Sequence, residues 1–134
     1  KAFFKHLEGG EAEITAVYPA GIIKDAKSNL EAAAAGEKME WTSLYADFGR
    51  IAAEEGFPEV ARSFEQVAKV EKFHEARYRK LIQNIANKEV FRRKTSVKWH
   101  CINCGYVVEG TEPPKECPTC KHTQAFYEIL AENF

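Results

Sequence analysis

The sequence predicts a mainly α-helical protein that ends in a small β-rich module built around a metal. Two observations support this fold class. Apolar residues recur at helical spacing through two long segments, and all four cysteines fall between residues 101 and 120. We therefore expect a helical domain over residues 1–94 and a metal-binding domain over residues 95–134.

The composition excludes several classes of protein. The 134 residues are 45% hydrophobic, which is typical of a globular protein, and 20 acidic and 19 basic side chains give a net charge of −1. Such a balance argues against binding of nucleic acid or of a membrane surface. The longest apolar stretches are short and rich in alanine, so neither a transmembrane segment nor a secretory signal is expected.

The chain opens in helix-like sequence, KAFFKHL, which ends at Gly9 and Gly10. A connector follows and runs past Pro19 and Gly21. Residue 1 is a lysine in the middle of a helical pattern, and it is not an initiator methionine. We expect that an N-terminal piece has been removed or left out.

Two long helices are expected next. One runs over about Ser28–Glu55 and ends at Gly56, because glycine readily adopts the left-handed conformation that closes a helix. The other runs over about Pro58–Asn87, and its proline lies in the first turn, where a missing N–H costs nothing. Together these two helices predict a helical hairpin.

The segment after the second helix is basic. VFRRKTSVKWH, residues 90–100, and its surroundings contain five lysines and arginines: Lys88, Arg92, Arg93, Lys94 and Lys98. These side chains could form a contact patch for an anionic partner. We favour the more common explanation, a solvated linker that leads into the first strand of the next module.

The four cysteines form two short loops, Cys101-Ile-Asn-Cys104 and Cys117-Pro-Thr-Cys120. A secreted disulfide scaffold spreads its cysteines along the chain, whereas this clustering favours one metal ion in a reducing cytoplasm. Four thiolates suit both zinc and iron, and the spacing does not separate the two metals. The segments YVVEG and AFYEIL predict short strands, and a module of under ~40 residues needs its metal to fold.

The two long helices share an unusual feature, because polar residues interrupt their apolar stripes. At steps of three and four the stripes read Leu30, Ala33, Glu37, Glu40, Leu44, Phe48, Ile51 and Val60, Phe64, Val67, Glu71, His74, Tyr78, Leu81, Ile85. A buried carboxylate is costly unless it is paired, neutralised or bound to metal. A helical hairpin brings four such groups to the same height, which predicts a metal site made of Glu37, Glu40, Glu71 and His74.

Taken alone, the pair Glu37 and Glu40 or the pair Glu71 and His74 is weak evidence for a metal site, because Glu-x-x-Glu and Glu-x-x-His also occur on exposed helix faces. Their position within apolar stripes favours the metal. Other glutamates fall off the stripes, and we interpret them as solvated: Glu54, Glu55, Glu65 and Glu75. Di-iron and di-manganese carboxylate bundles take a glutamate from each of two helices and Glu-x-x-His from each of the other two, so this chain offers half of such a set.

The segments FFKHLEGG, YPAGI, GEKMEW, EEGF and VEKFHEARY, followed by CINCGY and CPTC, resemble the rubrerythrin family over essentially the whole chain. This resemblance implies a ferritin-like four-helix bundle with a non-haem di-iron centre, followed by a rubredoxin-like Fe(Cys)4 domain. It implies a cytoplasmic peroxidase that reduces hydrogen peroxide to water and protects against oxidative stress. It further implies electron supply by rubredoxin or an NAD(P)H-dependent reductase and a homodimer or higher oligomer, with neither nucleic acid nor membrane as a partner.

The resemblance also implies the site residues. Glu37 and Glu40 match the glutamate pair of the third bundle helix, and Glu71 and His74 match the Glu-x-x-His of the fourth. Tyr45 matches a tyrosine beside the metals, although a packed ring with a satisfied hydroxyl is an equally good interpretation. The cysteines match the iron ligands of the small domain, which favours iron, with zinc as a substitute: Cys101, Cys104, Cys117 and Cys120.

The family's first two bundle helices, which would precede KAFFKHLEGG, have no counterpart here, and Phe3 stands three residues before His6 where a glutamate is needed. Three explanations remain open: a lost N-terminal piece, which we favour, a second polypeptide, or a half-bundle completed by a two-fold dimer. Two other functions also remain open. One is an electron-transfer module with an incomplete di-iron site, and the other is a zinc-ribbon interaction protein that binds through residues 92–98.

Overall fold

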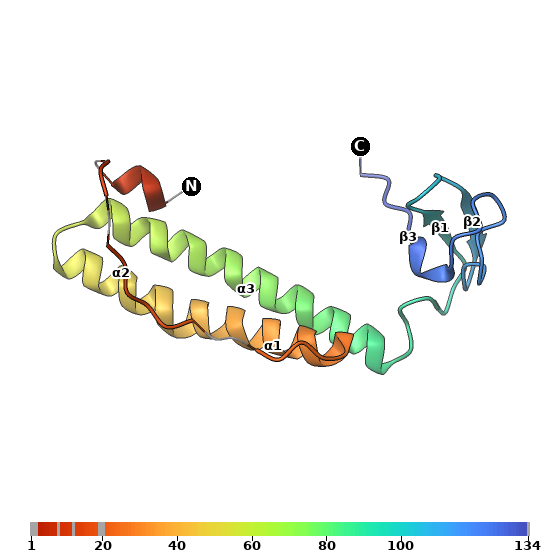
Figure 1. The fold of residues 1–134 in the computed structure, drawn as a ribbon, viewed down its shortest axis with the longest axis horizontal. Helices are drawn as coiled ribbons and strands as arrows, with labels where there is room; N and C mark the ends of the chain where they lie inside the picture. The colour runs from red at the N-terminus through yellow and green to blue at the C-terminus, as the bar shows by residue number, and fades with distance from the viewer. Residues whose placement is uncertain (1–2, 8, 12, 19–20, 134) are drawn as a thin grey trace. The chain divides into compact units, whose positions relative to one another are not determined.

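The computed structural model describes residues 3–7, 9–11, 13–18 and 21–133. By its internal contacts the chain divides into two compact units, Lys1–Ile82 and Gln83–Phe134. The first unit is helical, and the second carries a three-stranded antiparallel sheet (Figure 1). The expected fold class, a helical part followed by a small β-rich domain, is confirmed. The boundary expected between residues 94 and 95 stays a prediction.

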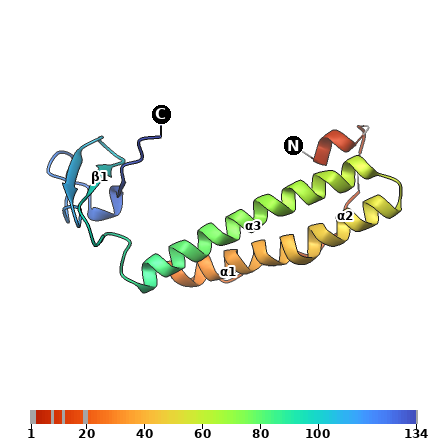
Figure 2. The same cartoon turned by 180° about the vertical axis from the view of Figure 1, so that it is seen from behind.

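The helical unit is a hairpin of two long segments. The first segment consists of α1 (Ala26–Met39), a π-helical turn η2 (Glu40–Leu44) and α2 (Tyr45–Glu54), and the second is α3 (Pro58–Ala86). Figures 1 and 2 show the two segments side by side and antiparallel. Both long helices expected from the sequence are confirmed, whereas the π turn at Glu40 has no signal in the sequence.

Local interactions explain where the first long helix begins and ends. Asp25 is its N-cap, because the Asp25 carboxylate accepts hydrogen bonds from the Ser28 N–H at 3.1 Å and from the Ser28 hydroxyl at 2.7 Å. The helix therefore starts slightly before its expected position at Ser28. At the other end, Gly56 has a φ of +87°, the left-handed conformation that closes the helix as expected.

The two helical segments approach closely because the residues buried between them are small: Ala34, Gly49, Ala52 and Ala61. Aromatic rings pack beside this contact, and the Phe64 ring centroid lies 4.8 Å from that of Phe3 and 5.4 Å from that of Phe48. The expectation that the apolar stripes are buried is met only in part, since Phe48, Ile51 and Leu81 remain 42%, 39% and 47% exposed. In a hairpin each helix has one partner, which covers only part of its apolar stripe. Full burial of the stripe needs further helices, as in a four-helix bundle.

The opening segment forms one 3-10 turn, η1 (Phe3–His6), where the sequence predicts a helix. His6 Nε2 lies 2.8 Å from Ser63 Oγ of α3, and this contact holds the turn against the hairpin. Gly9 and Gly10 both have positive φ, in agreement with the expected break. The connector that follows contains no helix or strand in the part that the structure describes, and Pro19 lies outside that part.

The second unit is built on β1 (Val97–Cys101), which lies between β2 (Val107–Gly110) and β3 (Tyr127–Ile129). A short 3-10 turn, η3 (Gln124–Phe126), leads into β3. Both pairings are antiparallel, and the strands expected in YVVEG and AFYEIL are confirmed. The core consists of a few residues around the cysteines: Trp99, Cys101, Cys117 and Tyr127.

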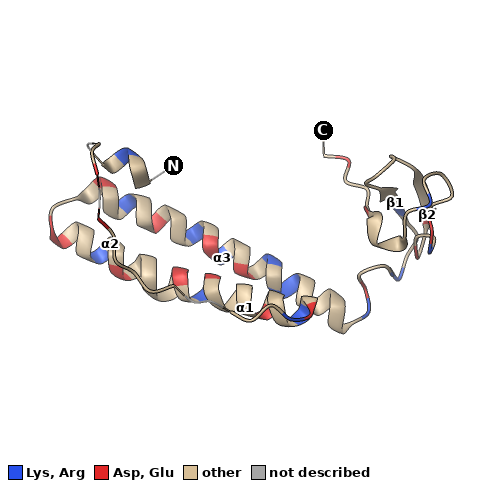
Figure 3. Ribbon diagram, viewed as in Figure 1, with Lys and Arg blue, Asp and Glu red and all other residues tan. Residues whose placement is uncertain are grey.

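The basic linker makes contacts within its own unit. Arg92 Nε lies 2.6 Å from Glu112 Oε1, and Arg93 donates to backbone carbonyls while its guanidinium lies 5.6 Å from the centre of the Trp99 ring. These contacts support the linker interpretation over a contact patch. Figure 3 shows acidic and basic residues interspersed along the helices. Among the described residues, no helix is long and apolar enough to cross a membrane.

Candidate metal centres

Three side chains converge between α1 and α3. His74 Nδ1 lies 2.7 Å from Glu71 Oε2 and 3.7 Å from Glu37 Oε1, and one ligand atom of each residue lies within 4.8 Å of the others. The side chains of Glu37 and Glu71 are only 18% and 14% exposed, whereas that of His74 is 42% exposed. The hairpin therefore brings together three of the four residues expected from the sequence, and both carboxylates are largely buried.

Glu40, the fourth expected residue, begins the π turn and is not part of this three-residue group. Its backbone carbonyl accepts a hydrogen bond from the Tyr45 N–H, and burial, followed by the charge of Glu40, raises the pKa of Tyr45. The ring of Tyr45 packs against Phe64, with centroids 6.0 Å apart. Tyr45 is thus a packed aromatic ring and a neighbour of Glu40 at the same time. A π turn redirects the side chains that follow it, and such turns recur at functional sites.

The acidic groups of this cluster disfavour each other when no cation lies between them. Burial, followed by the interaction with Glu71, raises the pKa of Glu37, and the imidazole of His74 opposes this shift. Carboxylates and imidazole are ligands that iron and zinc accept in proteins. The residues Glu37, Glu71 and His74 therefore fit a bound metal ion, which supplies the positive charge that the cluster lacks.

The interpretation of Glu75 as a solvated residue is wrong. Glu75 is only 8% exposed, its Oε2 accepts a hydrogen bond from Trp41 Nε1 at 2.6 Å, and its Oε1 lies 2.6 Å from Arg79 Nη2. The Trp41 bond, with Arg79 in support, lowers the pKa of Glu75. The sequence gives one hint of this contact. Trp41 and Glu75 each directly follow a predicted metal ligand, Glu40 and His74, and these ligands are expected at the same height of the hairpin. The contact joins the two helices next to the candidate ligands.

The structure agrees with the interpretation of the other three glutamates that lie off the apolar stripes as solvated residues. All are exposed in the structure: Glu54, Glu55 and Glu65. Glu75 differs from them because an indole N–H on the facing helix lies within hydrogen-bonding reach of its carboxylate.

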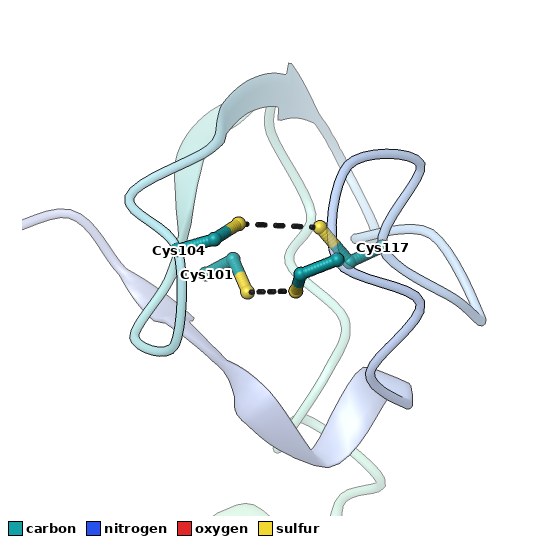
Figure 4. Close-up of side chains that lie close together, drawn as sticks. Cys101, Cys104 and Cys117 are labelled. Atoms are coloured by element: carbon teal, nitrogen blue, oxygen red, sulfur yellow. Dashed lines mark hydrogen bonds between the residues drawn. The ribbon is translucent and has the colours of Figure 1, made fainter.

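The cysteine sulfurs form the second cluster, in the sheet unit. Cys101 Sγ lies 3.7 Å from Cys120 Sγ, and Cys104 Sγ lies 3.7 Å from Cys117 Sγ. Figure 4 shows Cys101 and Cys104 of one loop directed toward Cys117 of the other. A tetrahedron with metal–sulfur bonds of about 2.3 Å has edges of about 3.8 Å, so this spacing fits a single metal ion.

The two cysteine loops share one backbone conformation. In each, the N–H of the residue after the second cysteine, Gly105 or Lys121, donates to the carbonyl of the first cysteine, at 2.9 and 3.0 Å. Both residues have positive φ, +82° and +62°, although only one is a glycine. The pKa of Cys120 is lowered to about 6, and the largest cause is hydrogen bonding from the backbone N–H of His122. The Cys117–Cys120 loop thus favours the thiolate form that binds metal.

Tyr127 lines the same cluster, and no signal in the sequence selects it. The residue is 5% exposed, and its hydroxyl has no hydrogen-bond partner among the described residues. Burial and then the sulfur of Cys117 raise the pKa of Tyr127. Burial opposes ionisation of Cys117, but the Cys120 N–H and the nearby Tyr127 hydroxyl outweigh it, and the pKa of Cys117 is lowered.

Comparison with known proteins finds a matching family model for each of the two parts of the chain that carry a cluster. Residues 1–82 match the family model described as Rubrerythrin, and residues 99–128 match the model described as Rubrerythrin, rubredoxin-like domain. Over 134 residues, all of this chain, the sequence is 51% identical to rubrerythrin of Nitratidesulfovibrio vulgaris and 51% identical to rubrerythrin of Porphyromonas gingivalis. The chain covers 70% and 67% of those two proteins.

Solved structures give the same result for the fold. The mixed-valence state of nigerythrin is 26% identical, with a TM-score of 0.53, over 96% of this chain and 60% of the nigerythrin chain. Its fully reduced, all-ferrous state matches with a TM-score of 0.52. The chain thus spans less than two thirds of the nigerythrin chain.

Fold and clusters together define a protein with a carboxylate–histidine site on a helical hairpin and a four-cysteine site in a sheet module. The chain belongs to the rubrerythrin family. Domains of this family bind iron, so the four-cysteine cluster is an Fe(Cys)4 site, and the cluster of Glu37, Glu71 and His74 resembles a di-iron site. The family consists in general of oxidoreductases. The expected family and the preference for iron are confirmed.

Proposed function

We propose that this protein is a peroxidase that reduces hydrogen peroxide to water in the cytoplasm and protects the cell from oxidative stress. Each turnover consumes two electrons and two protons and yields two water molecules. The electrons come from rubredoxin or an NAD(P)H-dependent reductase and pass through the Fe(Cys)4 site. The observation that carries this proposal is the convergence of Glu37, Glu71 and His74 in a chain that also carries a four-cysteine site.

The proposed ligands of the di-iron centre are Glu37, Glu40, Glu71 and His74. When bound, the iron ions supply electrons and positive charge for cleavage of the O–O bond. Glu37 and Glu71 are the candidates for bridging ligands, because both are largely buried and both lie next to His74. Glu71 Oε2, 2.7 Å from His74 Nδ1, holds the imidazole in place. Carboxylates suit this role because they are hard, anionic ligands.

A tyrosine beside the proposed ligands can supply a proton. The Tyr45 hydroxyl keeps its proton, because burial and then the charge of Glu40 raise its pKa. Glu37 has a different role, because a carboxylate that binds a metal ion is ionised. We therefore propose Tyr45 as the group that holds a proton for the product water.

The substitution Glu71→Ala tests this assignment. We expect loss of peroxide turnover with an unchanged Fe(Cys)4 absorption spectrum, because Glu71 belongs only to the helical cluster. Glu65→Ala, which removes an exposed glutamate from the same helix, is the matched control and should retain turnover. Retained turnover in the Glu71 variant would refute the proposed site.

A second candidate function is an electron carrier without a peroxide site of its own. It is favoured by the position of Glu40 outside the group of three converging ligands. Iron analysis separates the two functions, since a di-iron centre adds two irons to the single iron of the four-cysteine site. One iron per chain would support the carrier, and a colourless protein that contains zinc would support an interaction module.

We further propose a homodimer or higher oligomer. The supporting observation is the exposure of Phe48, Ile51 and Leu81 on the hairpin, because such apolar side chains gain stability when another surface covers them. Sedimentation of the protein over a range of concentrations tests this, and a monomer at all concentrations would contradict it.

A further inference from the structure

The core of the sheet unit contains one polar group whose interactions are incomplete. Trp99 and Tyr127 are both buried there and both carry a polar atom. The Trp99 Nε1–H donates to the Gly110 carbonyl at 2.9 Å, whereas the Tyr127 hydroxyl has no partner in the part of the chain that the structure describes. A buried hydroxyl without a partner is unfavourable, so its presence needs an explanation.

The surroundings of this hydroxyl indicate its partner. Tyr127 is 5% exposed, and its strand β3 pairs with β1 so that Tyr127 lies opposite Cys101. Its side chain belongs to the same buried cluster as the sulfurs of Cys101 and Cys117. Burial raises the pKa of the Tyr127 hydroxyl most, and among the sulfurs Cys117 contributes more to this shift than Cys101. A thiol is a weak acceptor, but a thiolate bound to metal carries the negative charge that makes a hydroxyl donor effective.

We propose that Tyr127 is a positioning residue of the Fe(Cys)4 site: its O–H donates a hydrogen bond to Cys117 Sγ when the site holds iron, and this bond raises the reduction potential of that iron. The proton stays on the tyrosine oxygen, because tyrosine ionises far above neutral pH. The hydrogen bond thus satisfies the buried hydroxyl, and it also fixes the direction of one ligand.

The effect on the potential follows from charge. Four thiolates give the ferric site a net charge of −1, and one electron from an external donor makes it −2. A hydrogen-bond donor directed at sulfur stabilises the more negative ferrous state more strongly, so reduction becomes more favourable. Tyr127 would therefore influence how readily this site accepts an electron. This inference rests on iron in the four-cysteine site, which the family supports, and not on the proposed peroxide reaction.

The first test compares reduction potentials in the iron-loaded protein, titrated with dithionite and followed by the absorption of the Fe(Cys)4 site. Tyr127→Phe removes the hydroxyl and keeps the ring, so we expect a shift to a more negative potential. Tyr106→Phe is the matched control, because Tyr106 packs against the same core but is only half-buried. An unchanged potential in the Tyr127 variant would overturn the proposal, whether or not peroxide is turned over.

The second test detects the bond itself. With cadmium-113 in the four-cysteine site, the Tyr127 hydroxyl proton should exchange slowly with water and show scalar coupling to the metal through Cys117 Sγ. Tyr127→Phe should abolish this signal, and Tyr106→Phe should preserve it. A merely structural role for the ring would give no such coupling, so its absence in the unsubstituted protein would overturn the proposal even if the Tyr127 variant failed to bind metal.

Discussion

Glu37 and Glu75 are both largely buried carboxylates of the helical hairpin, yet their partners give them opposite properties. Glu75 is met by the Trp41 indole and by Arg79, and these donors lower its pKa. Glu37 is buried beside the carboxylate of Glu71, and its pKa is raised. A carboxylate with donors is satisfied within the chain, whereas one that faces another acid needs a proton or a metal. This difference marks Glu37 as a candidate ligand and Glu75 as a structural group.

Trp99 provides a prediction about stability at the residue scale. Trp99→Phe removes ring volume from a site that is 1% exposed and leaves the Gly110 carbonyl without its donor. We expect the sheet unit to lose about 1–3 kcal/mol of unfolding free energy. Denaturant unfolding followed by the Fe(Cys)4 absorption measures this. An unchanged midpoint would show that the buried indole contributes nothing to the stability of the module.

The first long helical segment shows what single interactions do at the scale of an element. Its start is determined by Asp25, whose carboxylate binds Ser28, and its middle contains the π turn at residues 40–44. The turn places a local irregularity at Glu40, between the largely buried Glu37 and the packed ring of Tyr45. The element is therefore regular at its ends and irregular beside the candidate site.

The N-cap predicts a pH dependence. Hydrogen bonds from Ser28 lower the pKa of Asp25 below its ordinary value of 3.8. A lowered pKa means that the cap stabilises the helix above pH 3.8 and that this contribution is lost as the pH falls through the native pKa. NMR titration of the Asp25 carboxyl carbon measures that pKa. Ser28→Ala should move it back toward 3.8, and an unchanged titration would contradict the assigned cap.

Substitution of two helical glycines, Gly49 and Gly36, tests how closely the two helical segments pack. A Cβ added at Gly49 would lie 3.6 Å from the Ala61 carbonyl and 3.6 Å from Phe64 Cβ, whereas one added at Gly36 would meet nothing within 4 Å. Both positions accept alanine, and each change should add about 0.5–1 kcal/mol to helix stability, because alanine loses less backbone entropy. Denaturant unfolding followed by circular dichroism measures both variants.

Larger side chains should separate the two positions. Gly49→Leu should lower stability by about 1–3 kcal/mol, because the side chain must push α3 away from α2. Gly36→Leu is the control, and it should not be destabilising. Equal effects of the two leucine substitutions would mean that the helices do not pack at Gly49 as the structure has them.

The whole molecule consists of two units whose stability has different origins. The helical hairpin packs through small residues and aromatic rings, and the sheet unit has a core of only a few residues around its cysteines. Such a small core needs the metal to stay folded. Each unit contains one tryptophan with a bonded indole N–H, Trp41 in the hairpin and Trp99 in the sheet unit.

Metal removal from the four-cysteine site should therefore unfold one unit selectively. After chelation under reducing conditions, we expect the indole N–H signal of Trp99 to lose its chemical shift dispersion and its protection from exchange, while the signal of Trp41 persists. NMR of the whole chain measures both signals at once. Loss of both together would show that the two units fold as one, and retention of both would show that the sheet unit does not depend on its metal.

The sequence by itself determined the two long helices, the strands and the four-cysteine cluster, because helical periodicity, the Gly56 stop and the CxxC spacing are local signals. It also identified Glu37, Glu71 and His74 as candidates, since they interrupt apolar stripes. The resemblance to a known family then indicated iron, which composition and spacing left open.

Only the tertiary structure decided which polar groups meet. Glu75 accepts a hydrogen bond from Trp41, which lies on the facing helical segment, and the Tyr127 hydroxyl, unpaired within the described part of the chain, is buried in one cluster with cysteines of two different loops. The π turn that begins at Glu40 is likewise absent from the periodicity. Contacts between residues far apart in the chain carry no periodic signal, so their partners became known only once the helices and loops were in place.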